Sequence, residues 1–420
     1  MRSPRVPLEL IALVVENLSD RDCLHNCALA ASVFLYPCQK RLYDQLSLTT
    51  SIDDGAVLPV REALRPLGSL RPLHTYAEAA RHFAAAPHLA GYVAMVYVAI
   101  EPESGDRDAS ETAEMISALL AVLTGVRRCC LLGLQEEAVV WATVAGGVRD
   151  ALLGWLLAQG TLEKITVYGV VRLPRATLHV LLGASPSLHI LQGDVDHANS
   201  QSALQVSEEL EWMRRVAATD TRVMLLELAV ATSPLIDRVL QQPEFAQYLN
   251  QLQVLNTNIQ AMPLSTVCFS SAATIDTLKL DCVHATKDNL FRFPPSLPLL
   301  QGLQLTIGLH HLADSPLSDL LFLPQLLRAL NEDTSCPKLR TITFIVLLQD
   351  DMVPLSEEML SQLDKTLHAF TSLARVRWLL VASELGQSDD DAMEAFREDM
   401  VRGLSKMAAV GKVVVQHYGE

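Results

Sequence analysis

The chain has 420 residues, half of them hydrophobic, which is enough for one large domain or several smaller ones around a sizeable core and is too apolar for a disordered protein. Its net charge of −15 arises entirely within residues 91–420, and acidic surfaces repel phosphate backbones, so we expect no nucleic-acid partner. Every long apolar stretch is interrupted by charged residues, so we also expect no membrane span and no secretion signal.

The first 50 residues predict three short helices. Pro7 is suited to open the first, because the first helical position needs no N–H partner. Its apolar residues recur at helical spacing, at Leu8, Ile11, Val15 and Leu18, with Leu10 and Val14 widening that stripe. Ser19 or Asp20 can cap a second helix, which Pro37 is expected to end or kink. A third helical turn over residues 40–46 then leads into a short strand at Leu46-Ser47-Leu48.

Three helices of this size bury too little apolar surface to be stable alone. Their apolar stripe must therefore be covered either by the remaining chain, as a cap on the following domain, or by another protein. The residue pattern leaves both alternatives open.

This N-terminal segment resembles an F-box. The family opens with Leu-Pro-x-Glu-Leu-Leu, and Val6-Pro7-Leu8-Glu9-Leu10-Ile11 occupies that place here. An acidic turn and a leucine follow, and then a Cys-x-Leu segment with an aromatic residue; the matching residues are Leu18, Asp20, Asp22, Leu24, Cys27, Leu29 and Phe34. The end of the segment, residues 38–43, is similar to that of F-box-like proteins of mushroom-forming fungi.

The resemblance implies that the helices dock on the Skp linker protein of a Skp–cullin–F-box ubiquitin ligase. The docking residues that it implies are Pro7, Leu8, Leu10, Ile11, Leu18, Leu24 and Phe34. In such an adaptor the rest of the chain holds a protein substrate, and catalysis belongs to other subunits.

Residues 51–90 are expected to form a helical linker, with a helix from Tyr76 to Ala86. A pattern of aliphatic-x-x-aliphatic-x-aliphatic then recurs to the end of the chain at intervals of 23 to 39 residues. Its first positions are Val93, Val126, Leu162, Leu188, Val223, Leu252, Ile275, Leu300, Leu339, Leu373 and Val410. The alternating part of each copy predicts a strand.

Helices are predicted between these strands, over residues 175–182, 235–249, 320–330, 357–370 and 389–407. One strand and one helix in repetition are typical of a leucine-rich-repeat solenoid. The expected fold is therefore α/β: a three-helix F-box module over residues 1–50, the linker, and a leucine-rich-repeat-like solenoid of strands and helices over 91–420. An ordinary α/β domain with a parallel sheet is the alternative, because it has the same order of elements.

The residues between the aliphatic positions of each strand should face away from the helices and offer a recognition surface. The candidate substrate face consists of Lys164, Tyr168, Asn256, Asn258, Lys279, Asp281, Gln304, Arg375 and Arg377. Their mixture of charged, amide and aromatic groups is common at protein interfaces, although solvated residues on any sheet look similar.

The sequence gives no sign of catalysis. It contains no nucleotide-binding, zinc-protease or serine-hydrolase motif, and its eight cysteines include no pair at metal-binding spacing. We therefore expect no catalytic residue, metal or cofactor, and reduced thiols in a cytoplasmic or nuclear protein. The expected function is that of a substrate-recognition adaptor; a repeat scaffold without a ligase role, whose N-terminal helices form a cap, is the alternative, and an enzyme comes third.

Overall fold

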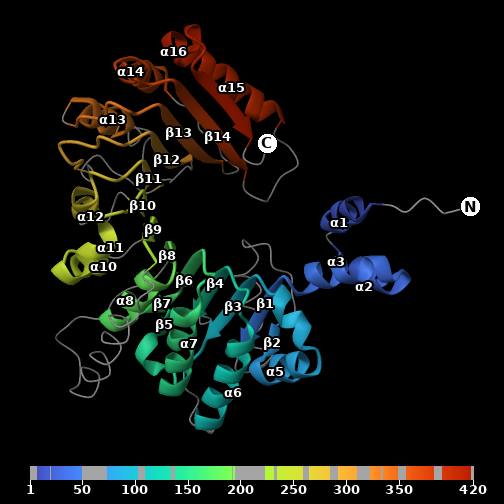
Figure 1. The fold of residues 1–420 in the computed structure, drawn as a ribbon. Helices are drawn as coiled ribbons and strands as arrows, with labels where there is room; N and C mark the ends of the chain where they lie inside the picture. Colours follow the sequence, from blue (N-terminus) through green and yellow to red (C-terminus); the bar gives the residue numbers. More distant parts are fainter. Residues whose placement is uncertain are drawn as a thin grey trace, which may run out of the picture. The chain divides into compact units, whose positions relative to one another are not determined.

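The computed structural model describes most of the chain in two compact units, residues Met1–Val223 and Met224–Glu420. Each unit is an α/β structure in which parallel strands lie side by side and helices pack on the sheet (Figure 1). The described residues are 7–18, 20–49, 73–102, 109–133, 138–191, 193, 223–230, 234–258, 264–283, 292–309, 322–332, 334–348, 356–382 and 390–417.

The first unit begins with three helices, α1 (Leu8–Glu16), α2 (Arg21–Ala30) and α3 (Ser32–Tyr43). Of the two predicted candidates, Asp20 caps α2: its Oδ2 accepts a hydrogen bond from the Cys23 amide at 2.8 Å. The predicted break at Pro37 is wrong, because the chain turns at Ala31, which has extended φ and ψ, and Pro37 lies inside α3. A proline within a helix removes one backbone hydrogen bond and strains the preceding turn, but it does not stop this helix.

The sheet of the first unit has the strand order β2-β1-β3-β4-β6-β8, and all of its pairs are parallel. The strands are β1 (Gln45–Thr49), β2 (Leu73–Thr75), β3 (Met95–Ile100), β4 (Arg128–Gly133), β6 (Lys164–Tyr168) and β8 (Ser187–Leu191). A small second sheet pairs β5 (Val139–Val140) with β7 (Val170–Val171). The connecting helices are α5 (Tyr76–Ala85), η2 (Pro87–Tyr92), α6 (Ala109–Val122), η3 (Trp141–Thr143), α7 (Gly146–Ala158) and α8 (Arg175–Ala184).

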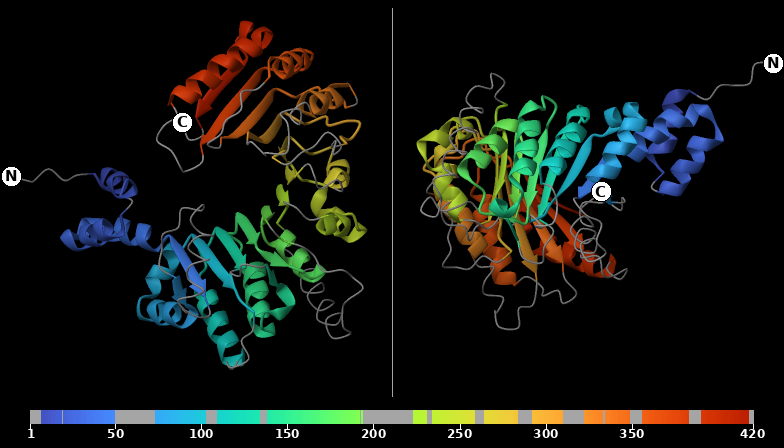
Figure 2. Two further views of the ribbon diagram at one scale, coloured as in Figure 1. Left: turned by 180° about the vertical axis from the view of Figure 1, so that it is seen from behind. Right: turned by 90° about the horizontal axis from the view of Figure 1, so that it is seen from below.

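The second unit continues the same design, with strand order β9-β10-β11-β12-β13-β14-β15. Its strands are β9 (Glu227–Val230), β10 (Val254–Asn258), β11 (Thr277–Asp281), β12 (Gly302–Leu309), β13 (Thr341–Leu348), β14 (Arg375–Ala382) and β15 (Val413–His417). Its helices are α10 (Pro234–Leu240), η4 (Pro243–Phe245), α11 (Ala246–Leu249), α12 (Leu264–Ser270), α13 (Phe322–Glu332), α14 (Glu357–His368), α15 (Asp390–Gly403) and α16 (Ser405–Ala409). Figure 2 shows α13 to α16 gathered on one face of the neighbouring strands.

The helix between β9 and β10 was predicted as one segment over residues 235–249. It is divided into α10, η4 and α11, because Pro243 begins a short 3-10 turn. The predicted helix over 357–370 is present as α14, and its N-cap Ser356 accepts a hydrogen bond from the Met359 amide at 3.2 Å. The predicted helix over 389–407 is present as α15 and α16, separated at Leu404.

The core of each unit lies between the sheet and its helices, and the aliphatic positions of the sequence pattern form it. In β11, β12 and β13 every predicted aliphatic position is buried: Ile275, Leu278, Leu280, Leu300, Leu303, Leu305, Leu339, Ile342 and Phe344. The strand register places these residues opposite their equivalents, for example Leu278 beside Leu303. In these three strands the pattern thus predicted both the strand and the face that it buries. In the last copy it did not, because Val410 is exposed.

Two copies of the pattern were assigned the wrong register. In β8, Leu188 and Ile190 pair with the buried residues Ile165 and Val167, so Leu191 faces the other side of the sheet. In β9, Leu228 pairs with Leu255, which makes the buried set Leu225, Leu228 and Val230 instead of a set beginning at Val223. Extra aliphatic residues beside the true positions produced both errors.

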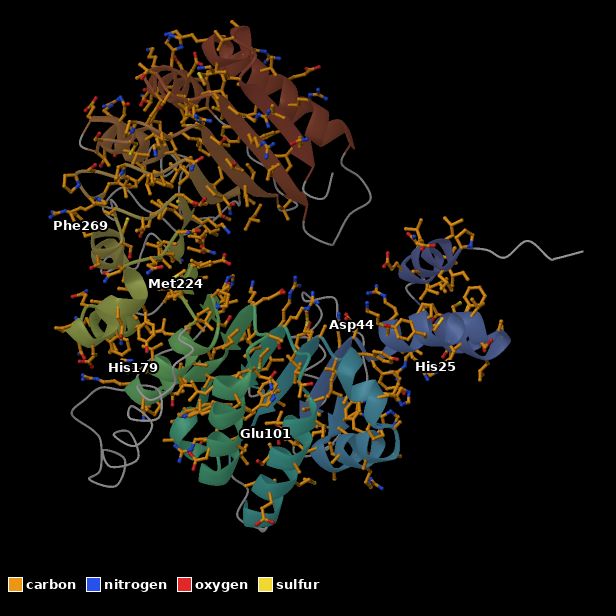
Figure 3. All side chains as sticks on the ribbon, viewed as in Figure 1. His25, Asp44, Glu101, His179, Met224 and Phe269 are labelled. Atoms are coloured by element: carbon orange, nitrogen blue, oxygen red, sulfur yellow. The ribbon has the colours of Figure 1, made fainter. Side chains whose placement is uncertain are left out.

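The strand predicted at Leu46-Ser47-Leu48 exists as β1 and pairs with β3, with Leu46 opposite Val96 and Leu48 opposite Val98. The sheet therefore starts directly after α3, within the segment assigned to the N-terminal module. Asp44, labelled in Figure 3, marks this junction: its carbonyl oxygen accepts hydrogen bonds from the Ala94 and Met95 amides at 2.8 and 2.9 Å.

Candidate functional site

The three N-terminal helices share a small core. It consists of the buried residues Val15, Leu24, Cys38 and Leu42, with Leu18, Cys27, Ala28, Phe34 and Tyr43 packed against them. Each helix therefore contributes to the cluster. Because a cluster of this size stabilises little by itself, the module depends on further contacts.

The module is attached to the rest of its unit through α3. The Tyr36 ring meets the Tyr92 ring of η2 edge to face, with ring centroids 5.5 Å apart. Tyr43 stacks on His82 of α5 at 5.3 Å. These contacts involve α3 and leave the outer side of α1 unused.

An outward apolar stripe follows α1. Leu10, Leu13 and Val14 are 52%, 54% and 55% exposed, at the spacing i, i+3 and i+4 that places residues on one helix face. Ile11 and Val15, on the opposite face, are buried. The helix is thus apolar on both faces, and Leu10 and Val14 do not widen the buried stripe as the sequence suggested.

Exposed apolar side chains are concentrated in this module. Among the described residues, eight of the fourteen large hydrophobic side chains classed as exposed belong to α1, α2 and α3: Leu8, Leu10, Leu13, Val14, Leu29, Val33, Leu35 and Tyr36. A concentration of this kind in a short segment is typical of a surface that another molecule covers.

The seven residues expected to dock on the Skp linker have different surroundings. Pro7, Leu8 and Leu10 are exposed, whereas Leu18 and Phe34 are half-buried and pack on the internal cluster. Ile11 and Leu24 are only 4% exposed, so they support the fold of the module and offer little contact surface.

Several exposed residues of the module are not among the seven predicted docking residues. Leu13 and Val14 are as exposed as Leu10, and Leu29 of α2 is 85% exposed. Helical spacing relative to Ile11 and Val15 would have identified Leu13 and Val14, because residues on the far side of an already apolar stripe cannot share its burial.

The nine residues of the candidate substrate face divide between the two units. Lys164 and Tyr168 lie on β6 in the first unit, and the other seven lie on β10, β11, β12 and β14 in the second. In the second unit the register aligns Asn256, Lys279, Gln304, Thr343 and Arg377 in one row across neighbouring strands. Asn258 lies opposite Asp281, one step along the strands, and is itself buried.

Some of these polar side chains satisfy one another. Lys279 Nζ lies 3.4 Å from Glu227 Oε1 in a half-buried ion pair. Asp281 accepts hydrogen bonds from the Asn258 side chain at 3.4 Å and from the Val283 amide at 3.1 Å. This part of the row is therefore internally paired.

Burial keeps two of the cysteine thiols protonated. All eight thiols are free, and burial raises the pKa of Cys268 to about 12 and that of Cys336 to about 11, so both stay protonated and weakly nucleophilic. Among the described residues no His, Cys, Asp and Glu side chains gather closely enough to hold a metal ion. The His310-His311 pair lies outside the described residues.

Within the part of the chain that the structure describes, every helix is too short or too polar to cross a bilayer. A scan against protein-family models gives no match, and a search of curated proteins gives none either.

Proposed function

We propose that this chain is a substrate-recognition adaptor of a Skp–cullin–F-box ubiquitin ligase. In this proposal α1 to α3 are an F-box module that docks on the Skp linker, and the repeated strands and helices form a leucine-rich-repeat-like solenoid that holds a protein substrate. The chain itself performs no catalysis in this role.

The observation that carries the proposal is the outward stripe of α1. Leu10, Leu13 and Val14 are kept in water on a helix whose other face already fills the core of the module. Each of these side chains is about half exposed, so covering the exposed part of one contributes about 1 kcal/mol, and a partner that covers all three gains affinity from each. The F-box-like sequence of the same segment supports the choice of the Skp linker as that partner.

The alternative function, a repeat scaffold with an N-terminal cap, has its own support. The Tyr36–Tyr92 and Tyr43–His82 ring contacts hold α3 against η2 and α5, as a cap would require. A cap does not account for the α1 stripe, however, because a cap turns its apolar residues toward the domain that it covers.

Substitutions in α1 separate the two functions. The double variant L10D/L13D puts charges on the exposed stripe without touching the core, so we expect recovery of the Skp linker in co-purification to fall at least about tenfold while the thermal midpoint stays unchanged. Deleting residues 1–48 would be a poorer test, since the deletion also removes most of β1 from the sheet.

Two controls make this result interpretable. Val401→Asp places the same charge on an exposed valine of α15 and should leave linker binding intact. Val15→Asp puts a charge into the core of the module and should unfold it. The adaptor proposal is contradicted if the unmodified, folded chain does not recover the linker. It is also contradicted if L10D/L13D and Val401→Asp recover equal amounts of linker. Either result would favour the scaffold.

A further inference from the structure

The second unit has a sheet face that its helices do not cover. Along β11 to β14, buried residues alternate with half-buried or exposed ones, and the buried set faces the helices. We call the other side, formed by the alternate residues of β9 to β14, the open face. Its members near the strand beginnings are polar, among them Gln304, Thr341, Thr343, Arg375 and Arg377.

Arg375, which is exposed, and Arg377, which is half-buried, are charges of the open face that no described residue neutralises. Within the described residues, neither guanidinium makes an ion pair or a hydrogen bond, and Nε of Arg377 is buried without a partner. On one side β13 presents hydroxyl groups to them, since Thr341 lies opposite Arg375 and Thr343 opposite Arg377. On the other side β15 places the apolar Val414 opposite Arg377. On β12, the next strand beyond β13, the uncharged Gln304 lies opposite Thr343.

Two acidic residues of the same face, Asp281 and Glu227, are distant from the arginines and already engaged. Asp281 belongs to β11, three strands from β14, which corresponds to roughly 14 Å at the usual strand spacing. Glu227, on β9, is paired with Lys279. The two arginines therefore form a positive site in a chain whose net charge is −15.

This arrangement has a definite chemical complement. A guanidinium presents parallel N–H groups that match the two oxygens of a carboxylate, and hydrogen bonds to ionised groups are stronger than neutral ones. A buried donor without a partner is unfavourable, so a ligand that supplies the missing acceptor gains in affinity. Thr341, Thr343 and Gln304 add further donors beside the arginines.

The spacing also fits an extended ligand. Arg375 and Arg377 are two residues apart on one strand, so their Cα atoms are separated by about 6.8 Å, the same repeat as alternate side chains of an extended peptide. Further along the same face are the half-buried aliphatic residues Ile345, Leu379 and Val381. A ligand that covers both parts carries acidic residues at alternate positions and aliphatic residues next to them.

We propose that the open face around Arg375 and Arg377 binds an acidic, extended segment of another protein. That this segment belongs to a ubiquitin-ligase substrate rests on the adaptor function proposed above, whereas the binding itself does not. The site gives the chain a substrate class, namely proteins that expose a glutamate- or aspartate-rich stretch flanked by aliphatic residues.

The test uses the full chain and a short fluorescent peptide with glutamates at alternate positions followed by leucines. A second peptide carries glutamine in place of each glutamate. Fluorescence anisotropy should show tighter binding of the glutamate peptide, and binding should weaken as salt is raised from low to physiological concentration. The double variant R375Q/R377Q should weaken binding of the glutamate peptide at least about tenfold.

Arg328→Gln is the control. Arg328 is an exposed arginine of α13, a helix that packs on the buried side of the sheet through Leu323 and Leu327. The variant removes a positive charge from the helix side of the unit and should leave the affinity unchanged. The thermal midpoint of R375Q/R377Q should equal or exceed that of the unmodified chain, because an unpaired buried donor is lost.

Equal affinity for the two peptides, or equal weakening by R375Q/R377Q and Arg328→Gln, would overturn the proposal. Because the peptide is measured on the chain alone, the result is independent of the Skp linker. If the chain binds the peptide but not the Skp linker, the binding site stands and the adaptor proposal fails. If the chain binds the linker but not the peptide, the adaptor proposal stands and this substrate class fails.

Discussion

His74 shows how burial of a single residue produces a pH-dependent stability. The residue lines a cavity of about 120 Å³ together with Arg21, Tyr43 and His82, at the junction between the helical module and the sheet. Burial lowers the pKa of His74, and the nearby charge of Arg21 lowers it further, while Glu78 acts in the opposite direction. The folded chain therefore favours neutral His74.

The consequence for stability follows from the sign of that shift. Between the folded pKa and the ordinary value of 6.5 the unfolded chain binds more protons, so the free energy of unfolding falls as the pH drops below about 6.5. His74→Gln stays neutral at every pH and should lose this part of the acid sensitivity. Thermal unfolding of the unmodified chain and of His74→Gln at about pH 7.5 and about pH 5.5 measures how much each midpoint falls with pH. An equal fall in the two chains would contradict the expectation.

Among the helices, Asp364 of α14 shows how one element completes another. Its carboxylate, almost fully buried, accepts hydrogen bonds from the Lys406 and Met407 amides of α16 at 3.2 and 3.1 Å. Amides in the first turn of a helix have no partner within that helix. Asp364 therefore acts as the N-cap that Leu404 cannot provide.

We expect Asp364→Ala to lower the free energy of unfolding by about 2 kcal/mol, because it leaves two first-turn amides unsatisfied next to a small void. Asp364→Asn keeps one acceptor oxygen and should lose less. Asp399→Ala is the control, since Asp399 pairs with the exposed Arg402 at 3.2 Å on the surface and such pairs contribute little. Chemical denaturation of the three variants gives the comparison, and equal values for Asp364→Ala and Asp399→Ala would refute the capping role.

Local sequence patterns predicted the helices and strands better than the contacts between them. Ser356 at the start of α14 and Asp20 at the start of α2 were readable, because their partners lie three residues away. The Asp364 cap was not, because its partners are 42 and 43 residues away along the chain. The break at Ala31 was missed for a different reason: Pro37 is the stronger helix breaker in isolation, and tertiary packing of Cys38 and Leu42 keeps α3 intact around it.

The same limit applies to the candidate sites. The alternation of aliphatic residues correctly predicted which face of β11 to β14 is buried, and hence that Arg375 and Arg377 lie on the other face. Which polar residues neutralise one another depends on the pairing of strands distant in sequence, such as Glu227 with Lys279, and no local pattern contains that information.

At the scale of the whole molecule, the division into two compact units predicts that damage stays local. Phe344 of β13 stacks on Trp378 of β14 with ring centroids 4.1 Å apart, and both side chains are fully buried in the second unit. Repeated strand–helix units exchange most of their contacts with immediate neighbours.

Phe344→Ala should therefore destabilise the second unit by about 3–5 kcal/mol and leave the first unit close to its normal stability. Hydrogen exchange followed by mass spectrometry should show faster exchange in β12 to β15, with β3, β4 and β6 unchanged. Ile345→Ala, on the open face of the same strand, is a milder control. Equal acceleration in all strands would mean that the chain unfolds as a single cooperative body.

The stripe of Leu10, Leu13 and Val14 also has a consequence for the life of the chain in a cell. Folding-surveillance proteins recognise misfolded chains by apolar side chains that remain in water, and this chain presents such side chains while correctly folded. A newly made copy that has not bound the proposed partner therefore resembles a damaged protein. We expect its lifetime to be short until the stripe is covered, so that the amount of chain that accumulates is set by the supply of the partner and not by its own rate of synthesis.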